Sequence, residues 1–291
     1  MRDYWLTQDL LKAAGVGFLA LAALGIGLAL WLPKKWWGKL LALIVVGVLI
    51  SIPVRKAGQE TKQQQVQVDD YKARYAKAKA LFDGRCKTAG EKIYRTVEGV
   101  EGVLLLNIRQ SDRPGIADNP LWPDAALPHE AAGDGYITTF LQWEQHEDKR
   151  TARGYLNSKK SDLPGYRFVD VKNAKLQYER YHLNAADPDR PRLEKEDVTS
   201  SPAKYAVTFS NEVIPEERTH WIAGTKLQVI ETETKDVLAE ASWYSFEPGL
   251  GSKAGFRQPW MFALTCPQWN GWDGARTRFF VDQILKPKRE K

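Results

Sequence analysis

Apolar positions follow three patterns along the chain. Two apolar runs come first, at residues 13–32 and 40–54. A polar stretch with apolar residues at helical spacing follows, and after it come short segments rich in β-branched and aromatic residues in partial alternation. The pattern predicts an α+β protein, with a β-rich soluble domain preceded by an N-terminal transmembrane helical hairpin and a stalk helix. The predicted boundaries are 1–55 for the hairpin, 56–84 for the stalk helix or linker, and 85–291 for the domain.

The first apolar run has the length of a membrane span. It continues without charge for about 20 residues, which at ~1.5 Å rise per residue crosses a ~30 Å hydrocarbon core. The second run reaches that length when Trp36 and Trp37 are included. We therefore predict membrane helices at about 10–32 and 37–54. The alternative is a signal peptide followed by a buried core helix, but the chain opens with Arg2, Asp3 and Asp9 rather than a cationic segment and lacks a convincing small-residue cleavage site before Pro33.

The connection between the two runs bears on orientation. Residues 31–40, WLPKKWWGKL, hold three lysines and three tryptophans. Tryptophan favours the headgroup level of a bilayer, and a lysine-rich turn favours the cytoplasmic side. Basic residues also flank the opposite side, so charge counts alone do not fix the orientation. The density of the lysine turn favours placing the rest of the chain outside the cytoplasm.

The distribution of charge excludes one class of function. The chain has a formal net charge of +6. Residues 1–62 contain eight Lys or Arg and three Asp or Glu, which leaves only +1 for residues 63–291. A nucleic-acid-binding protein carries its basic patch in the folded domain. We therefore expect no nucleic-acid partner.

Strands dominate the predicted domain. The stalk helix is predicted to end near Asp83-Gly84, where glycine favours termination. The segments with strand composition are 103–108, 166–171, 175–183, 204–209, 219–233 and 237–246. The last two are joined by a short turn and predict a hairpin. Residues 275–287 predict a final amphipathic helix, with Phe279, Phe280, Ile284 and Leu285 on one face and Pro287 at its end.

Two stretches rich in Pro, Gly and Asp, at residues 111–135 and 184–202, predict long surface loops. Long ordered loops often carry binding surfaces, whereas others are disordered insertions. We take Leu121, Trp122 and Asp124 in the first loop as candidate partner-binding residues. The alternative for Trp122 is that its ring only fixes the loop onto the domain.

The chain has two cysteines, Cys86 and Cys266. They lie outside any CxxC or Cys/His cluster, so their spacing matches neither a zinc site nor a redox motif. An even number at wide spacing is typical of a single structural disulfide in an oxidising compartment. The alternative is a pair of unrelated buried thiols.

Motifs for catalysis are missing from the sequence. The four histidines form no HExxH and no close pair, and there is no GxSxG. Ser201 and Lys204 have the SxxK spacing, but Pro202 lies between them and the companion motifs of that enzyme class are absent. We therefore predict no enzyme activity, no catalytic residue, no cofactor and no metal.

Longer segments carry a resemblance to a known family. They are RCKTAGEKIYRTVEGVEGVLLLNIR (85–109), GYRFVDV (165–171), the stretch 205–240, QPWMFALTCPQW (258–269) and TRFFVDQILKP (277–287). Over most of residues 81–287, the chain resembles the inner-membrane-anchored periplasmic immunity proteins of type VI secretion lipase (phospholipase) effectors in Gram-negative bacteria. The resemblance implies a soluble domain in the periplasm and one protein partner, a secreted lipase effector. It implies no catalytic residues, and it does not transfer binding positions.

The function implied is inhibition by occlusion. A lipase delivered into the periplasm attacks phospholipid, and an inhibitor held at that membrane by a hairpin has a raised effective concentration where the toxin acts. The alternative is a structural or accessory component of an envelope or secretion assembly. An envelope hydrolase is a third reading, which needs a nucleophile and base that the sequence does not supply.

Overall fold

The computed structural model describes residues 17, 20–31, 33–110, 115–143, 153–154, 165–173, 177–184, 192–198, 201–269 and 273–288. The chain forms two compact units, residues 1–73 and residues 74–291. Each unit is described by itself.

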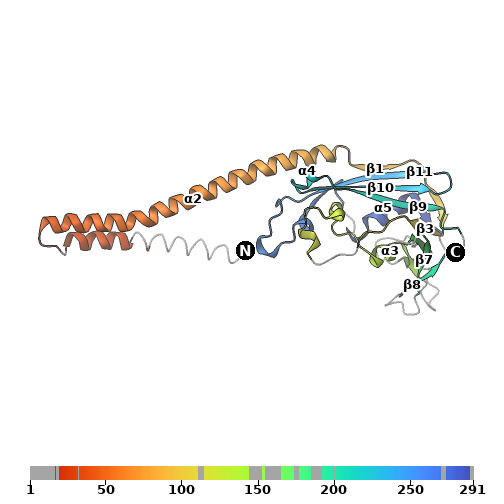
Figure 1. Ribbon diagram of the computed structural model, residues 1–291, viewed down its shortest axis with the longest axis horizontal. Helices are drawn as coiled ribbons and strands as arrows, with labels where there is room; N and C mark the ends of the chain where they lie inside the picture. Colours follow the sequence, from red (N-terminus) through yellow and green to blue (C-terminus); the bar gives the residue numbers. More distant parts are fainter. Residues whose placement is uncertain are drawn as a thin grey trace. The chain divides into compact units, whose positions relative to one another are not determined.

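The first unit is helical. Residues 20–31 form one helix, and after a short turn α2 (Trp36–Cys86) begins and continues for 51 residues into the second unit (Figure 1). The predicted second membrane helix and the predicted stalk are therefore one helix. The helix ends at Cys86, two residues beyond the Gly84 near which the stalk was predicted to end, because the packing of the last turns of α2 outweighs the ~1 kcal/mol cost of a glycine inside a helix.

The predicted spans at about 10–32 and 37–54 fall partly outside the described residues, which omit 10–16, 18, 19 and 32. In the part of the chain that the structure describes, no helix is both long enough and apolar enough to cross a membrane. The hairpin stays a prediction.

The second unit is an α+β domain built on a large mixed sheet. Its strands are β1 (Gly90–Ile93), β2 (Val97–Val100), β3 (Gly102–Leu105), β4 (Gln142–Trp143), β5 (Arg153–Gly154), β6 (Phe168–Lys172), β7 (Tyr178–Asn184), β8 (Arg192–Asp197), β9 (Tyr205–Glu212), β10 (Ile222–Glu231), β11 (Val237–Phe246), β12 (Leu264–Cys266) and β13 (Leu285–Pro287). Its further helices are α3 (Asp134–Phe140), α4 (Pro215–Arg218) and α5 (Arg276–Ile284), with 3₁₀ turns η1 (Ile116–Asp118), η2 (Pro123–Ala126), η3 (Ala254–Phe256), η4 (Pro259–Phe262) and η5 (Asp273–Ala275).

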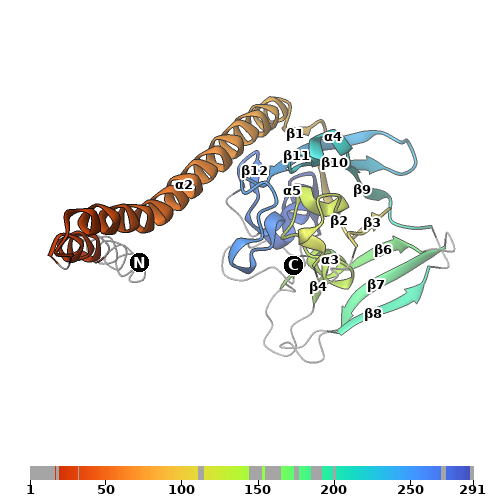
Figure 2. The same cartoon turned by 60° about the vertical axis from the view of Figure 1, so that its left-hand side comes forward.

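The main sheet has the strand order β1-β11-β10-β9-β3-β6-β7-β8, and β12 pairs with β11 (Figure 2). The strand β3 is parallel to both β6 and β9, whereas the other pairs in this sheet are antiparallel. The strands β13 and β2 form a separate parallel pair, and β4 pairs with β5. A mixed sheet of this kind is compatible with helices on one face and partial solvent exposure on the other.

The two faces of the sheet differ in what covers them (Figure 1). On the core face, Leu227 and Trp243 are fully buried, and the Trp243 ring packs edge-on against Phe280 of α5 at 5.8 Å between centroids. On the other face, Tyr244 and Phe246 pack against the last turns of α2. Successive side chains of a strand point to opposite faces of the sheet. Trp243 of β11 therefore lies on the core face, and its neighbour Tyr244 lies on the face covered by α2.

Most predicted strands are confirmed, with shifted ends. The segment 237–246 coincides with β11, and its hairpin with β10 is present. The predicted loop 184–202 was wrong in part, because β8 lies inside it and pairs with β7. The final helix ends at Ile284 rather than Pro287, because Leu285 begins β13 and pairs with β2 instead.

Candidate functional site: a surface formed by two ordered loops

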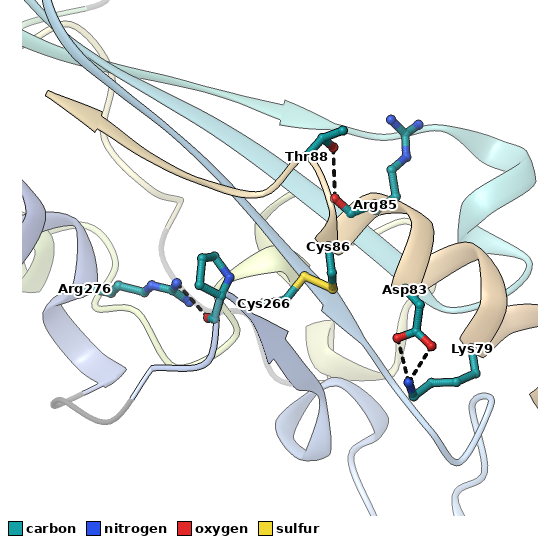
Figure 3. Close-up of a disulfide and its surroundings, with 8 residues drawn as sticks. Lys79, Asp83, Arg85, Cys86, Thr88, Cys266 and Arg276 are labelled. Atoms are coloured by element: carbon teal, nitrogen blue, oxygen red, sulfur yellow. Dashed lines mark hydrogen bonds and ion pairs between the residues drawn. A yellow bond between two sulfur atoms is a disulfide. The ribbon is translucent and has the colours of Figure 1, made fainter. Parts of the chain in front are cut away.

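Cys86 and Cys266 form a disulfide, which joins the start of the domain to a point near its C-terminal end (Figure 3). Its S–S distance is 2.06 Å, and the two Cα atoms lie 5.6 Å apart across a sequence separation of 180. The bond joins the last residue of α2 to β12, which pairs with β11. The prediction from cysteine count and spacing is therefore confirmed.

The end of α2 also packs directly on the sheet. The rings of Tyr75 and Phe82 lie 5.7 Å and 5.5 Å from the ring of Phe246. Arg85 forms an ion pair with Glu217. These contacts and the disulfide fix the last turns of α2 to the end of β11.

The loop that follows residue 115 is held from beneath by a buried ion pair. The Arg109 Nη1 atom donates to Asp124 Oδ1 at 2.9 Å, and both side chains are almost fully buried. Asn211 of β9 donates to the same oxygen at 2.8 Å. The Arg109 guanidinium also lies 4.3 Å from the centroid of the Phe209 ring. A buried carboxylate with these partners fixes the loop in one conformation.

The three residues predicted to contact a partner do not share one environment. Leu121 is 51% exposed, whereas Trp122 is 6% exposed and packs in a cluster with Trp260 and Ala223. Asp124 is buried in the ion pair described above. Of the three candidates, Leu121 alone has an accessible side chain. For Trp122 the alternative interpretation, that its ring fixes the loop onto the domain, agrees with its burial.

Arg218, the last residue of α4, links three segments. Its guanidinium donates to the carbonyl oxygens of Pro120, Pro123 and Glu212 at 3.3 to 3.5 Å. It also lies 5.5 Å from the centroid of the Trp260 ring. Burial lowers its pKa to about 10, which leaves it a cation at neutral pH. Arg218 therefore ties the segment around Leu121 to the end of β9.

A second loop is organised by Glu247, which follows β11 and is fully buried. Its two carboxylate oxygens accept the backbone N–H groups of Gly249 and Gly251 at 2.7 Å each. The same carboxylate pairs with Arg257 at 2.5 Å. The Glu247 carboxylate thus fixes the start and the end of the loop that runs from Glu247 to Arg257.

Phe256 lies in this loop and is fully exposed to solvent. Its φ of 59° is in the left-handed region, which a bulky residue rarely adopts. Phe262, six residues later, is 56% exposed and lies under the Arg257 guanidinium at 4.6 Å from the ring centroid. The loop therefore presents two aromatic rings from a backbone that is fixed beneath them.

The two loops touch each other. Lys253 pairs with Asp118 at 3.1 Å, and the Trp260 Nε1 atom donates to the Asn119 carbonyl oxygen at 2.9 Å. We use the term two-loop surface for residues 118–122 and 253–262, with the exposed side chains of Leu121, Phe256 and Phe262. Single exposed apolar side chains are common on protein surfaces, but these three come from two loops that contact each other and have fixed backbone, so we take the two-loop surface as the candidate binding site.

The first loop is also attached to α5. Both carboxylate oxygens of Glu130 lie within hydrogen-bonding distance of the Thr277 backbone N–H, at 3.1 Å and 3.4 Å. Burial raises the pKa of Glu130 from 4.5 to about 7, against the lowering effects of Arg109, the Thr277 hydrogen bonds and Arg276. The carboxyl group therefore titrates near neutral pH.

The structure places Lys204, the lysine of the SxxK spacing, in an ion pair. The Lys204 Nζ atom pairs with Glu231 at 2.8 Å, and this contact raises the pKa of Lys204. A lysine that acts as a general base needs a lowered pKa. Within the described ranges, no group of three His, Cys, Asp or Glu side chains is arranged to hold a metal ion.

Comparisons with protein-family models, with curated proteins and with solved structures found no match to this chain. The surface is therefore interpreted from its own geometry.

Leu121 and Asp124 were predicted from the sequence, but Arg109, Glu247 and Phe256 were not. Arg109 follows a strongly apolar strand, and Glu247 follows the aromatic end of another. The signal in each case was a charged residue directly after an apolar segment. Each of these residues pairs with an opposite charge in a loop, Arg109 with Asp124 and Glu247 with Arg257. Phe256, between a glycine and an arginine, had no periodic pattern around it.

Proposed function

We propose that this chain is a membrane-anchored immunity protein that binds and occludes a lipase delivered into the periplasm. In this proposal the helices at about 10–32 and 37–54 form a hairpin in the inner membrane, and residues 74–291 fold in the periplasm. The partner class comes from the resemblance of the segments between residues 85 and 287.

The observation that carries the proposal is the two-loop surface. It combines exposed apolar side chains with backbone fixed by Glu247, Asp124 and Arg218. Side chains on rigid backbone lose little entropy on binding, so an exposed aromatic ring can supply much of the affinity of an interface. A stable complex needs ~800 Å² from each partner, and the two loops with their surroundings are a suitable centre for such an area.

The disulfide supports the proposed compartment. A bond between Cys86 and Cys266 persists in oxidising spaces such as the periplasm and is rare in the cytosol. Occlusion also requires no catalytic group, which agrees with the ion-paired state of Lys204.

The test uses competition between siblings. A strain that lacks the gene should be sensitive to siblings with an active secretion system, and the full chain should restore protection. The double variant Leu121→Asn/Phe256→Asn should fail to protect, whereas Ser201→Ala should protect like the wild type. Replacement of the whole segment 118–128 is a poorer test, because it removes the buried Asp124 and disturbs folding.

The same experiment distinguishes the immunity function from the alternative function. A deletion strain that competes normally would exclude immunity and would favour a component of an envelope or secretion assembly. Protection that survives the double variant would exclude the two-loop surface as the binding site. Full-length protein with an intact disulfide must be present in the membrane fraction for each variant.

A further inference from the structure

The outer face of the sheet has a hollow of about 450 Å³ that shares no residue with the two-loop surface. It lies across β9, β10 and β11, which Figure 1 and Figure 2 both show side by side. Its size falls in the ~300–1,000 Å³ range of small-molecule sites.

The hollow is a consequence of side-chain size at paired positions. Ser210, Lys226 and Ser242 pair in register across the three strands, and Gly90 of β1 pairs with Ser242. Thr208, Gln228 and Glu240 form the next rung, with Lys92 beyond them. The small side chains and the glycine leave space above the backbone, because every other residue of a strand points to this face.

The long side chains lean away from the middle of the hollow. The Lys226 Nζ atom pairs with Glu212 at 2.7 Å, toward the end covered by α2. On the other side, Tyr94 donates from its hydroxyl to Glu240 at 2.8 Å, and Lys92 also contacts Glu240, at 3.4 Å. Both charges inside the hollow are therefore neutralised by residues at its rim.

The side chains that line the hollow restrict the class of ligand that it can bind. Ser210 and Ser242 carry hydroxyls, each a donor and an acceptor, and the Gln228 amide adds two donors and an acceptor. The Thr208 hydroxyl already donates to Asn107 Oδ1 at 3.2 Å, so it offers a ligand only an acceptor. A strongly anionic ligand finds no unpaired cation among these residues, and the lining side chains that point to this face of the sheet are polar. Tyr94, which is 59% exposed, is not part of the lining, but its hydroxyl is bound to the lining residue Glu240.

We propose that this hollow is a binding site for a neutral saccharide of one or two rings. Sugar hydroxyls are also both donors and acceptors, so they match the hydroxyl and amide groups of the floor, while a ring face packs on Tyr94. This site is independent of the lipase partner and of the immunity role.

The test is titration of the full chain with maltose, cellobiose and chitobiose, followed by calorimetry or by backbone amide shifts. The protein is purified in a detergent without a sugar headgroup, since a glycoside detergent would compete. We expect at least one of these disaccharides to bind with a Kd in the millimolar range. Titration with a longer oligomer of the same sugar then shows whether the site binds a polymer more tightly than the disaccharide.

Two variants locate the site. Gln228→Ala should weaken binding by about tenfold, the effect of one lost hydrogen bond, and Ser210→Trp should abolish it by filling the hollow. Gln258→Ala and Ser252→Trp, matched substitutions at exposed positions elsewhere, should bind like the wild type. The proposal is overturned if the wild type binds none of the three sugars, or if Gln228→Ala and Ser210→Trp both leave binding unchanged. Loss of protection against siblings is a separate readout, so the two proposals fail independently.

Discussion

The Glu130 carboxylate accepts the backbone N–H of Thr277, 147 positions later in the chain. Thr277 is the second residue of α5, whose own capping residue, Ala275, has no side chain able to accept that N–H. Glu130 therefore caps a helix from another part of the chain. The contact ties the end of the first loop to the C-terminal helix of the domain.

Glu130→Gln should change the pH dependence of stability. The pKa of Glu130 is about 7 in the folded protein against an ordinary 4.5, so the folded state holds the proton more tightly. Its contribution is fully present below pH 4.5 and is lost as pH rises through 7. At ~1.4 kcal/mol per pKa unit, the loss is about 3 kcal/mol. Chemical denaturation should find Glu130→Gln near the wild type at pH 4 and more stable at pH 8, and equal differences at both pH values would contradict this.

Removal of the buried carboxylate at Asp124 should destabilise the domain strongly. Asp124→Ala leaves the Arg109 cation buried without its partner, and such losses cost ~3–5 kcal/mol. The matched control is Asp118→Ala in the same loop, whose partner Lys253 is exposed, and it should cost ~1 kcal/mol or less. Urea denaturation of both variants measures the difference. Similar costs for the two variants would show that the buried pair does not hold the loop.

The disulfide should contribute measurably to stability. In the chain-entropy model a loop this long gives about 5 kcal/mol, and the values measured for removal of native disulfides range over ~2–5 kcal/mol. The double variant Cys86→Ala/Cys266→Ala should lose that amount in chemical denaturation. In protein isolated from the envelope, both thiols should resist alkylation until a reductant is added. Alkylation without reduction would argue against an oxidising compartment.

Phe256 should be dispensable for folding. Phe256→Asn removes a fully exposed ring and places at φ 59° a residue that tolerates the left-handed region. Its free energy of unfolding should stay within ~0.5 kcal/mol of the wild type or rise. Phe280→Ala, which empties a buried position in the main core, should cost ~3–5 kcal/mol. A large loss from Phe256→Asn would mean that the ring has a structural partner.

The sequence predicted those parts of the fold whose pattern is local. The hairpin of residues 219–246 was recognised because its apolar residues repeat over two long segments joined by a short turn. By contrast, β8 carries charges on nearly every position and has no apolar pattern, since it lies at the edge of the sheet and is mostly exposed. The end of α5 was misplaced because Leu285 fits a helical face equally well, and only the strand β2 decides its conformation.

The candidate site could be predicted only in part, for a related reason. Leu121 was identified because an apolar residue inside a Pro-rich loop is unusual. Its neighbour Trp122 has the same local pattern and the opposite exposure, since the position of the Trp260 ring decides which of the two is covered. Arg218, which holds backbone carbonyl groups from two other segments, leaves no local pattern of its own.

The bond from Cys86 to Cys266 has a mechanical consequence. Tension applied along α2 reaches Cys86 and passes through the sulfur atoms into β12, which is paired with β11 inside the main sheet. The strands between the two cysteines, from β1 to β11, lie within the covalent loop and bear no part of a load drawn between α2 and the C-terminal segment. With the bond intact, a load between α2 and the C-terminal segment therefore passes through covalent bonds from Cys86 to Cys266, and the pairing of β1 with β11 is not in its path. In the reduced form the same load would pass from α2 into β1, and hydrogen bonds rather than a covalent bond would carry it.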